Sequence, residues 1–162
     1  MTGIGTTLRG LIALEIETRK MEGYFSDNGF DVEQVWAPVE ELENLKRDHP
    51  YGKLYIVTGP ADEGPNRTRD VRSGLALREV PISLGFQRAN VPPSDIATID
   101  MLVDIVDQLY EVLRRFVPNE EYGWIRTEAL KDDNGVPFDY VSLTSNNFFE
   151  AYFVTYYSYV TT

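Results

Sequence analysis

The sequence predicts an α+β domain, built on a mixed and mainly antiparallel β-sheet with two principal helices packed on one face. Three observations predict it. Residues 94–117 repeat apolar side chains at helical spacing, and residues 4–22 repeat them less regularly. Residues 75–88 and 148–160 have the composition and alternation of long strands. A length of 162 residues suits one domain with a substantial core.

Residues 94–117 form the clearest helical pattern, with apolar side chains three and four positions apart. Ser94 or Asp95 is placed to cap the start, directly after a proline pair that disfavours helix. Pro118 is expected to stop the helix. The side opposite the apolar face carries an acidic stripe. The stripe consists of Asp100, Asp104, Asp107 and Glu111.

The first half of the chain predicts shorter elements around one central strand. Residues 4–22 predict a helix that ends near Gly23 and flanks the helix at 94–117. Residues 30–36 predict a short strand, and residues 38–48 predict a short helix with proline at its first position. Residues 53–58, KLYIVT, are β-branched and aromatic between glycines, which predicts a central strand.

The strand at 75–88 alternates Ile82, Leu84 and Phe86 with small or polar residues, which is typical of a half-buried strand. Pro81 lacks a backbone donor and indicates an edge or a bulge at that point. Residues 122–130 predict a further strand, and the sequence DDNG at 132–135 predicts a turn.

The last predicted strand, 148–160, is aromatic on both faces. Phe153 and Tyr157 fall on one face, while Tyr152 and Tyr156 fall on the other. A strand with one solvated face does not have this pattern. The strand is therefore expected either to lie between two layers or to present one face to another chain.

Composition excludes several functional classes. The formal charge of −11 opposes nucleic-acid binding, which depends on neutralised phosphates. There is no cysteine, so thiol catalysis, thiolate metal sites and disulfides are excluded. No apolar run is long enough for a transmembrane helix, and the first twenty residues carry acids that a secretory signal would lack. We expect a soluble protein made in a reducing cytoplasm.

Candidate catalytic and ligand motifs are weak. The acidic stripe suits a solvated helix face or a repulsive potential on an assembly better than a cation site, because it lacks the other ligands. Residues 132–135 lack calcium-loop spacing, and residues 59–64 lack the Gly-Lys-Ser/Thr of a phosphate loop. His49 lies at a predicted helix end without a nucleophile elbow, which favours a capping role. We expect no enzyme activity, no cofactor and no metal.

A small basic cluster stands out in this acidic chain. It consists of Arg67, Arg69 and Arg72. It is either a solvated loop or a contact to an acidic patch on an identical or a different subunit, because arginine is favoured at interfaces.

The order of these segments resembles that of a known family. The segments are PVEELENLKRDHPYGKLYIVTGP, PISLGFQRAN, IATIDMLVDIVDQLYEVLRRF and FDYVSLTSNNFFEAYFVTYYSYV. Together they resemble the tail terminator (tail completion) proteins of tailed bacteriophages, over residues 4–117 with gaps and 138–160. On this resemblance the chain, 1–162, is one domain with a poorly matched insertion around 118–147.

The resemblance implies a structural virion protein of the tail or neck, with no catalytic residues. Such subunits form a six-fold ring on the tail tube, end its polymerisation and join it to the head-side connector or stopper protein. The genomic DNA passes through without specific binding, and no membrane is involved. Candidate interface residues are then the basic cluster with Tyr152, Tyr156, Tyr157 and Tyr159. The acidic stripe is expected to face solvent or the ring lumen.

Three alternatives remain open at this stage. Another neck or head–tail connector protein of the same virion would bind the portal side and not the tube. A small-molecule-binding or hydrolytic α/β domain would need converging polar groups, which the sequence does not show. A nucleic-acid-binding module is opposed by the net charge.

Overall fold

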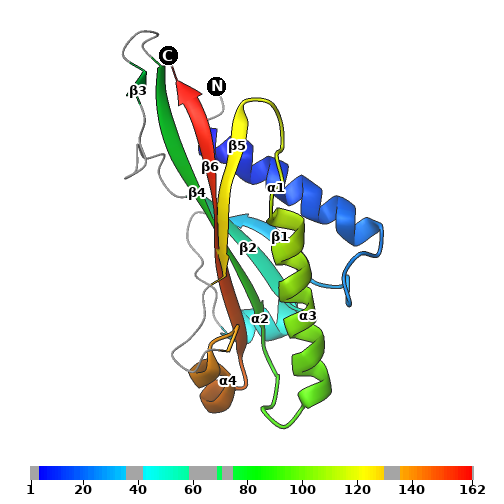
Figure 1. Ribbon diagram of the computed structural model, residues 1–162. Coiled ribbons are helices and arrows are strands. Elements are labelled where there is room, and N and C mark those ends of the chain that lie inside the picture. Colours follow the sequence, from blue (N-terminus) through cyan, green and yellow to red (C-terminus); the bar gives the residue numbers. More distant parts are fainter. Residues whose placement is uncertain (1–3, 36–41, 59–68, 71–74, 130–135, 162) are drawn as a thin grey trace.

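A computed structural model describes residues 4–35, 42–58, 69–70, 75–129 and 136–161. Its architecture is a mixed, mostly antiparallel β-sheet with helices, and the predicted α+β class is confirmed. Figure 1 shows the sheet as a long twisted layer with two helices along one side. Residues 59–64, which were rejected as a phosphate loop, and the turn expected at 132–135 lie outside the described residues.

The boundaries follow the predicted segments closely. The helices are α1 (Ile4–Met21), α2 (Leu42–Asp48), α3 (Ile96–Leu113) and α4 (Tyr140–Asn146). The strands are β1 (Asp31–Val35), β2 (Lys53–Thr58), β3 (Arg69–Asp70), β4 (Leu75–Arg88), β5 (Tyr122–Ala129) and β6 (Phe149–Thr161).

The strand order is β1-β2-β4-β6-β5, and β3 pairs with one end of β4. Only β1 and β2 are parallel, and the segment that joins them contains α2, as a parallel connection requires a crossover. The two long strands β4 and β6 are paired over thirteen residue pairs at the centre. The end of the β4–β6 pair, at 75–77 and 160–161, extends together with β3 beyond α1 and α3 in Figure 1. We call this part the arm.

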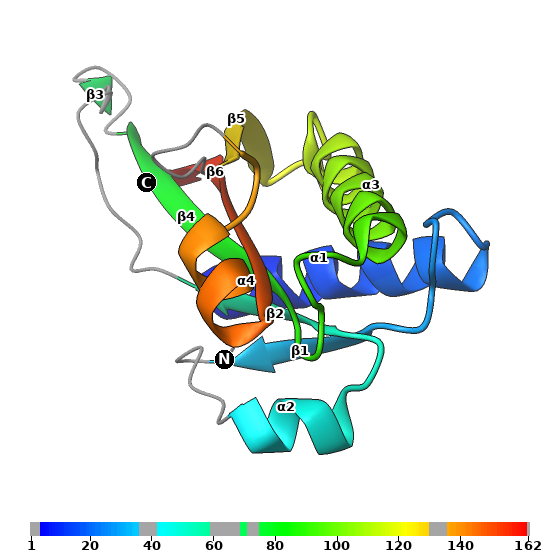
Figure 2. The same cartoon turned by 90° about the horizontal axis from the view of Figure 1, so that it is seen from below.

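The hydrophobic core lies between the sheet and the helices α1 and α3, which pack side by side on one face in Figure 2. The predicted flanking of α3 by α1 is confirmed, and the side chain of Gln108 in α3 also accepts a hydrogen bond from the Ser26 N–H at 2.8 Å. Alternate strand residues fill the core because successive side chains point to opposite faces. Fully buried examples are Leu8, Ile12, Ile56, Ile82, Phe86, Leu102, Leu109, Phe149 and Phe153.

The start of α3 is as predicted and its end is not. The Asp95 carboxylate caps the helix by accepting a hydrogen bond from the Thr98 N–H at 3.2 Å. The helix ends at Leu113, well before Pro118, because Arg114 is extended and Arg115 has a φ of 62°. The apolar pattern continues past the last helical turn because Phe116 still packs against the core.

Of the edge or bulge expected at Pro81, the structure shows the edge: β4 has no bulge there, and its described pairing with β2 ends at Thr58↔Ile82. The proline therefore lies just past that pairing, where a missing donor removes no described bond to β2. Helix α4 was not expected from the pattern, and it forms because Asp139 caps its start and Asn147 ends it with a φ of 53°.

Candidate interaction surface

The sheet has a second face, directed away from α1 and α3, which we call the open face. Figures 1 and 2 show no described helix across its middle. The strand register places its side chains in rows across β6, β4 and β2. One row is Glu150, Gln87 and Lys53; the next is Tyr152, Gly85 and Tyr55; the third is Val154, Ser83 and Val57.

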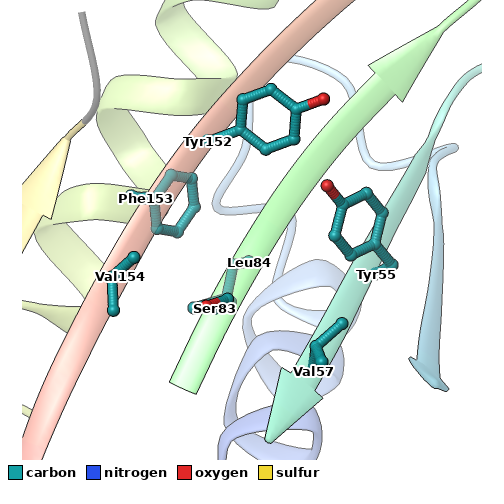
Figure 3. Close-up of a pocket in the computed structure, with 7 residues that line it drawn as sticks. All are labelled: Tyr55, Val57, Ser83, Leu84, Tyr152, Phe153 and Val154. Carbon is teal, nitrogen blue, oxygen red and sulfur yellow. The ribbon is translucent and has the colours of Figure 1, made fainter. Parts of the chain in front are cut away.

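A hollow of about 260 Å³ lies in the second and third rows. Its walls are Tyr55 and Val57 on one side and Tyr152 and Val154 on the other, as Figure 3 shows. The hollow exists because β4 contributes only glycine and serine between bulky residues of both neighbouring strands. The ring of Tyr55 occupies the space that a side chain at Gly85 would need.

The two tyrosines frame the hollow with both rings and hydroxyls. Their ring centroids are 6.4 Å apart with an interplanar angle of 56°, and both hydroxyls lie over β4 in Figure 3. Burial raises the pKa of Tyr55 well above its ordinary value, and the nearby charge of Glu150 adds to this effect. Tyr55 is therefore a neutral phenol, whose hydroxyl can both donate and accept a hydrogen bond.

One rim of the hollow is acidic. Gln87 Nε2 donates to Glu150 Oε1 at 3.2 Å. The pKa of Glu150 is raised by burial, and repulsion from Asp139 adds to this, while the Gln87 hydrogen bond opposes it. No Lys, Arg or His among the described residues forms an ion pair with Glu150, so this carboxylate lacks a cationic partner within that part of the chain.

The opposite rim, toward β5, holds a cation that is already engaged. The guanidinium of Arg126 lies 3.9 Å from the centre of the Tyr156 ring. It also donates to Glu128 at 3.0 Å and lies 3.8 Å from Glu79, which is buried. These contacts hold Arg126 over β6. Among the described residues, the second and third rows of the open face contain no basic side chain.

The β1 edge of this face carries a cluster around the single histidine. His49 Nδ1 lies 2.7 Å from Asp31 Oδ2, and Nε2 lies 3.4 Å from Glu33 Oε1. Lys53 Nζ lies 2.8 Å from Glu33 Oε2. The ring therefore contacts β1, and among the described residues it forms no hydrogen bond that would cap α2 as expected. Within the described residues, no group of three or more His, Asp or Glu side chains is suited to hold a metal ion.

The candidate interface tyrosines separate by face. Tyr152 and Tyr156 are half-buried on the open face. Tyr157 is wrong as an interface residue, because its side chain is 0% exposed and belongs to the core below α1 and α3. Tyr159 lies on that same side, partly buried with its ring centroid 5.8 Å from that of Tyr122.

Of the two charged candidate sets, the acidic stripe lies within the described residues and the side chains of the basic cluster do not. The acidic stripe lies on the outer side of α3, and all four of its carboxylate residues are exposed. Arg67, Arg72 and the side chain of Arg69 lie outside the described residues. The backbone of Arg69 is described, and it pairs with Ala76 at the end of the arm.

Sequence reasoning missed Tyr55 and Ser83, which line the hollow, and Gly85, whose backbone the Tyr55 ring covers. The run KLYIVT gives no sign that Tyr55 belongs to a different surface from Leu54 and Ile56, because all three are apolar or aromatic. The glycine at 85 in an otherwise regular strand was the available signal, since such glycines often mark a close approach of another group.

No family model matches this chain, and the search of curated proteins finds no relative. None of the helices within the described residues is long and apolar enough to span a membrane.

Proposed function

We propose that this protein is a tail terminator subunit of a tailed bacteriophage, which assembles into a six-fold ring on the tail tube. The observation that supports this most is the open face with its aromatic hollow. Tyr152, Val154 and Tyr156 remain half-exposed there, although the sheet already has a full core on its other side. An apolar and aromatic sheet face of this kind is typical of a protein contact.

A ring requires two unlike surfaces on each subunit, because its contacts are heterologous. The open face offers one, and the projecting arm offers a second surface at a different place on the subunit. The net charge of −11 and the exposed acidic stripe suit a channel wall that repels DNA, which lets the genome pass without sticking. The partners in this proposal are other copies of the chain, the tube protein and the head-side connector.

The proposal is tested by mixing the purified protein with tail tubes and, separately, with connector complexes. Co-sedimentation and negative-stain images should show rings at one end of the tubes. Val154→Lys, which places a charged chain in the hollow, should lose this binding. Leu14→Lys is the matched control, because Leu14 is 64% exposed on α1 and lies away from the open face.

The other neck proteins are distinguished by the same experiment. Binding to connector complexes without binding to tubes would contradict the terminator assignment and favour a connector role. Binding to neither would remove the basis for a virion function.

A further inference from the structure

We propose that Asn28 is a latent deamidation site, and that the carboxylate of Asp27 keeps it unreactive in the folded chain. The site is the pair Asn28–Gly29 in the loop between α1 and β1. It does not involve the open face, so it is independent of the proposed ring.

An asparagine followed by glycine is especially prone to deamidation, because glycine has no side chain to hinder the reaction. The backbone nitrogen of Gly29 would lose its proton and attack Cγ of Asn28. A new C–N bond then forms, and the side-chain nitrogen of Asn28 takes up a proton and leaves as ammonia. Water opens the resulting succinimide ring to give aspartate or isoaspartate.

The structure opposes the first step at the attacking nitrogen. The N–H of Gly29 donates to Asp27 Oδ1 at 2.8 Å, which is a hydrogen bond to a charged acceptor. A carboxylate is much too weak a base to remove a backbone amide proton, and its negative charge opposes the formation of an amide anion beside it. Asp27 therefore holds the nucleophile in its protonated, unreactive form.

The side chain under attack is also held. Asn28 Oδ1 accepts from the Phe25 N–H at 3.1 Å, and Asn28 Nδ2 donates to the Phe25 carbonyl at 3.1 Å. These partners fix the orientation of the amide, because a backbone N–H only donates and a carbonyl only accepts. Cyclisation expels Nδ2, so it must break the bond to the Phe25 carbonyl.

Packing explains why the reactive pair is retained. A Cβ at position 29 would lie 3.2 Å from Cγ of Tyr51 and 3.1 Å from Oδ1 of Asp27. Any larger residue would crowd the Tyr51 ring and the carboxylate. The loop therefore requires Gly29, and Asp27 suppresses the reactivity that comes with it.

Deamidation would loosen a loop that joins three elements. Phe25 is 4% exposed, and its ring centroid lies 5.3 Å from that of Phe30, just before β1. The N–H of Ser26 donates to Gln108 of α3 at 2.8 Å. Aspartate at position 28 would turn an oxygen, in place of the Nδ2 donor, toward the Phe25 carbonyl. Loss of this clamp would weaken the attachment of α1 and β1 to α3.

The rate of deamidation at Asn28 tests the role of Asp27. Folded protein is incubated in mildly alkaline buffer, and peptide mapping by mass spectrometry follows the reaction at this residue. The reference is a peptide of residues 24–32, YFSDNGFDV, with both ends blocked. Asn28 in the wild type should react about tenfold more slowly than in the peptide, or more slowly still, because the peptide does not hold these hydrogen bonds.

Asp27→Ala should raise the rate at Asn28 in the folded protein by about tenfold, because it removes a hydrogen bond to a charged group. Asp27→Asn keeps an acceptor without the charge, so its rate should lie between the two. Circular dichroism establishes that each variant is folded, and Asp27→Asn carries the comparison if Asp27→Ala is not folded.

Thr127→Val is the control for unfolding, because it removes a buried hydroxyl far from this loop in the sheet. Its rate at Asn28 should equal that of the wild type. The proposal is overturned if wild-type Asn28 reacts as fast as the peptide, or if the folded Asp27 variants react at the wild-type rate. It is also overturned if Thr127→Val raises the rate as much as Asp27→Ala, since the protection would then come from global folding alone.

Discussion

The ring of Tyr55 lies directly over the backbone of Gly85 on the open face. A side chain at position 85 would therefore collide with the phenol. The two residues are also register partners on β2 and β4. This relationship sets the position of Tyr55 and leaves the hollow beside it. It follows that glycine is required at position 85 by packing, not by backbone conformation.

Gly85→Ala is therefore expected to destabilise the fold by about 1–3 kcal/mol, the range for overpacking a well-filled site. Urea unfolding measures this. Gly10→Ala is the matched control, because the nearest atom to a Cβ there is 3.7 Å away in a helix, where alanine is favoured by about 1 kcal/mol. Equal effects of the two changes would contradict the packing argument. Combining Gly85→Ala with Tyr55→Ala should give less than the sum of the single effects.

A buried hydroxyl pair joins β5 to β6. Thr127 Oγ1 lies 2.8 Å from Thr155 Oγ1 and accepts a hydrogen bond from Trp124 Nε1 at 3.0 Å. Thr127→Val should cost about 1–3 kcal/mol, because it leaves buried polar groups without their partner. Thr144→Val, at an exposed position of α4, should change the unfolding free energy by less than about 0.5 kcal/mol. If Thr127→Val lowered the unfolding free energy by no more than this control does, the hydroxyl pair would contribute little to stability.

Stability should depend on pH through Glu150. Its pKa in the folded state is raised above the ordinary value of 4.5, mainly by burial. The folded state therefore binds this proton more tightly than the unfolded state, and stability is lost as pH rises through the window that begins near the ordinary value. Glu150→Gln keeps an acceptor for Gln87 without the charge, so it should be more stable than the wild type at neutral pH.

Thermal unfolding at a series of pH values checks this sign. The advantage of Glu150→Gln should shrink as pH falls and disappear well below 4.5. Glu111→Gln, on the exposed stripe, is the control. An advantage that persists unchanged in acid would mean that charge is not the cause.

The outer side of α3 should tolerate charge reversal. Asp104→Lys combined with Asp107→Lys alters only exposed residues, so the unfolding free energy should change by no more than about 1 kcal/mol for the pair. Circular dichroism and urea unfolding measure this. Loss of helical signal would show that this side of α3 is not the solvent-facing side.

The alternation of residues along β6 correctly predicted from the sequence which side chains share a face. Phe149, Phe153 and Tyr157 were placed on one face, and all three are buried. What alternation does not reveal is which face the helices cover. Both faces of β6 are aromatic, so Tyr157 was grouped with Tyr152 and Tyr156 as a candidate contact. The correct grouping needs the packing of α1 and α3, which is a tertiary property.

The hollow could not be predicted because it depends on pairing. Tyr55, Gly85 and Tyr152 are far apart in the chain and become one row only through the registers of β2 with β4 and β4 with β6. The two caps of α4 could have been predicted from the sequence, since Asp139 and Asn147 are typical capping residues. A helix of seven residues, however, is too short for periodicity to reveal.

A tail terminator ends the growth of the tail tube, and this is the activity that we propose for this chain. The most direct measurement follows polymerisation of the tail-tube protein, with and without this protein, by the length distribution of tubes in negative stain. Substoichiometric amounts relative to tube protein are expected to shorten the tubes and to place a ring at one end of each. Tubes of unchanged length with bare ends, at ring-forming concentrations of folded protein, would contradict it.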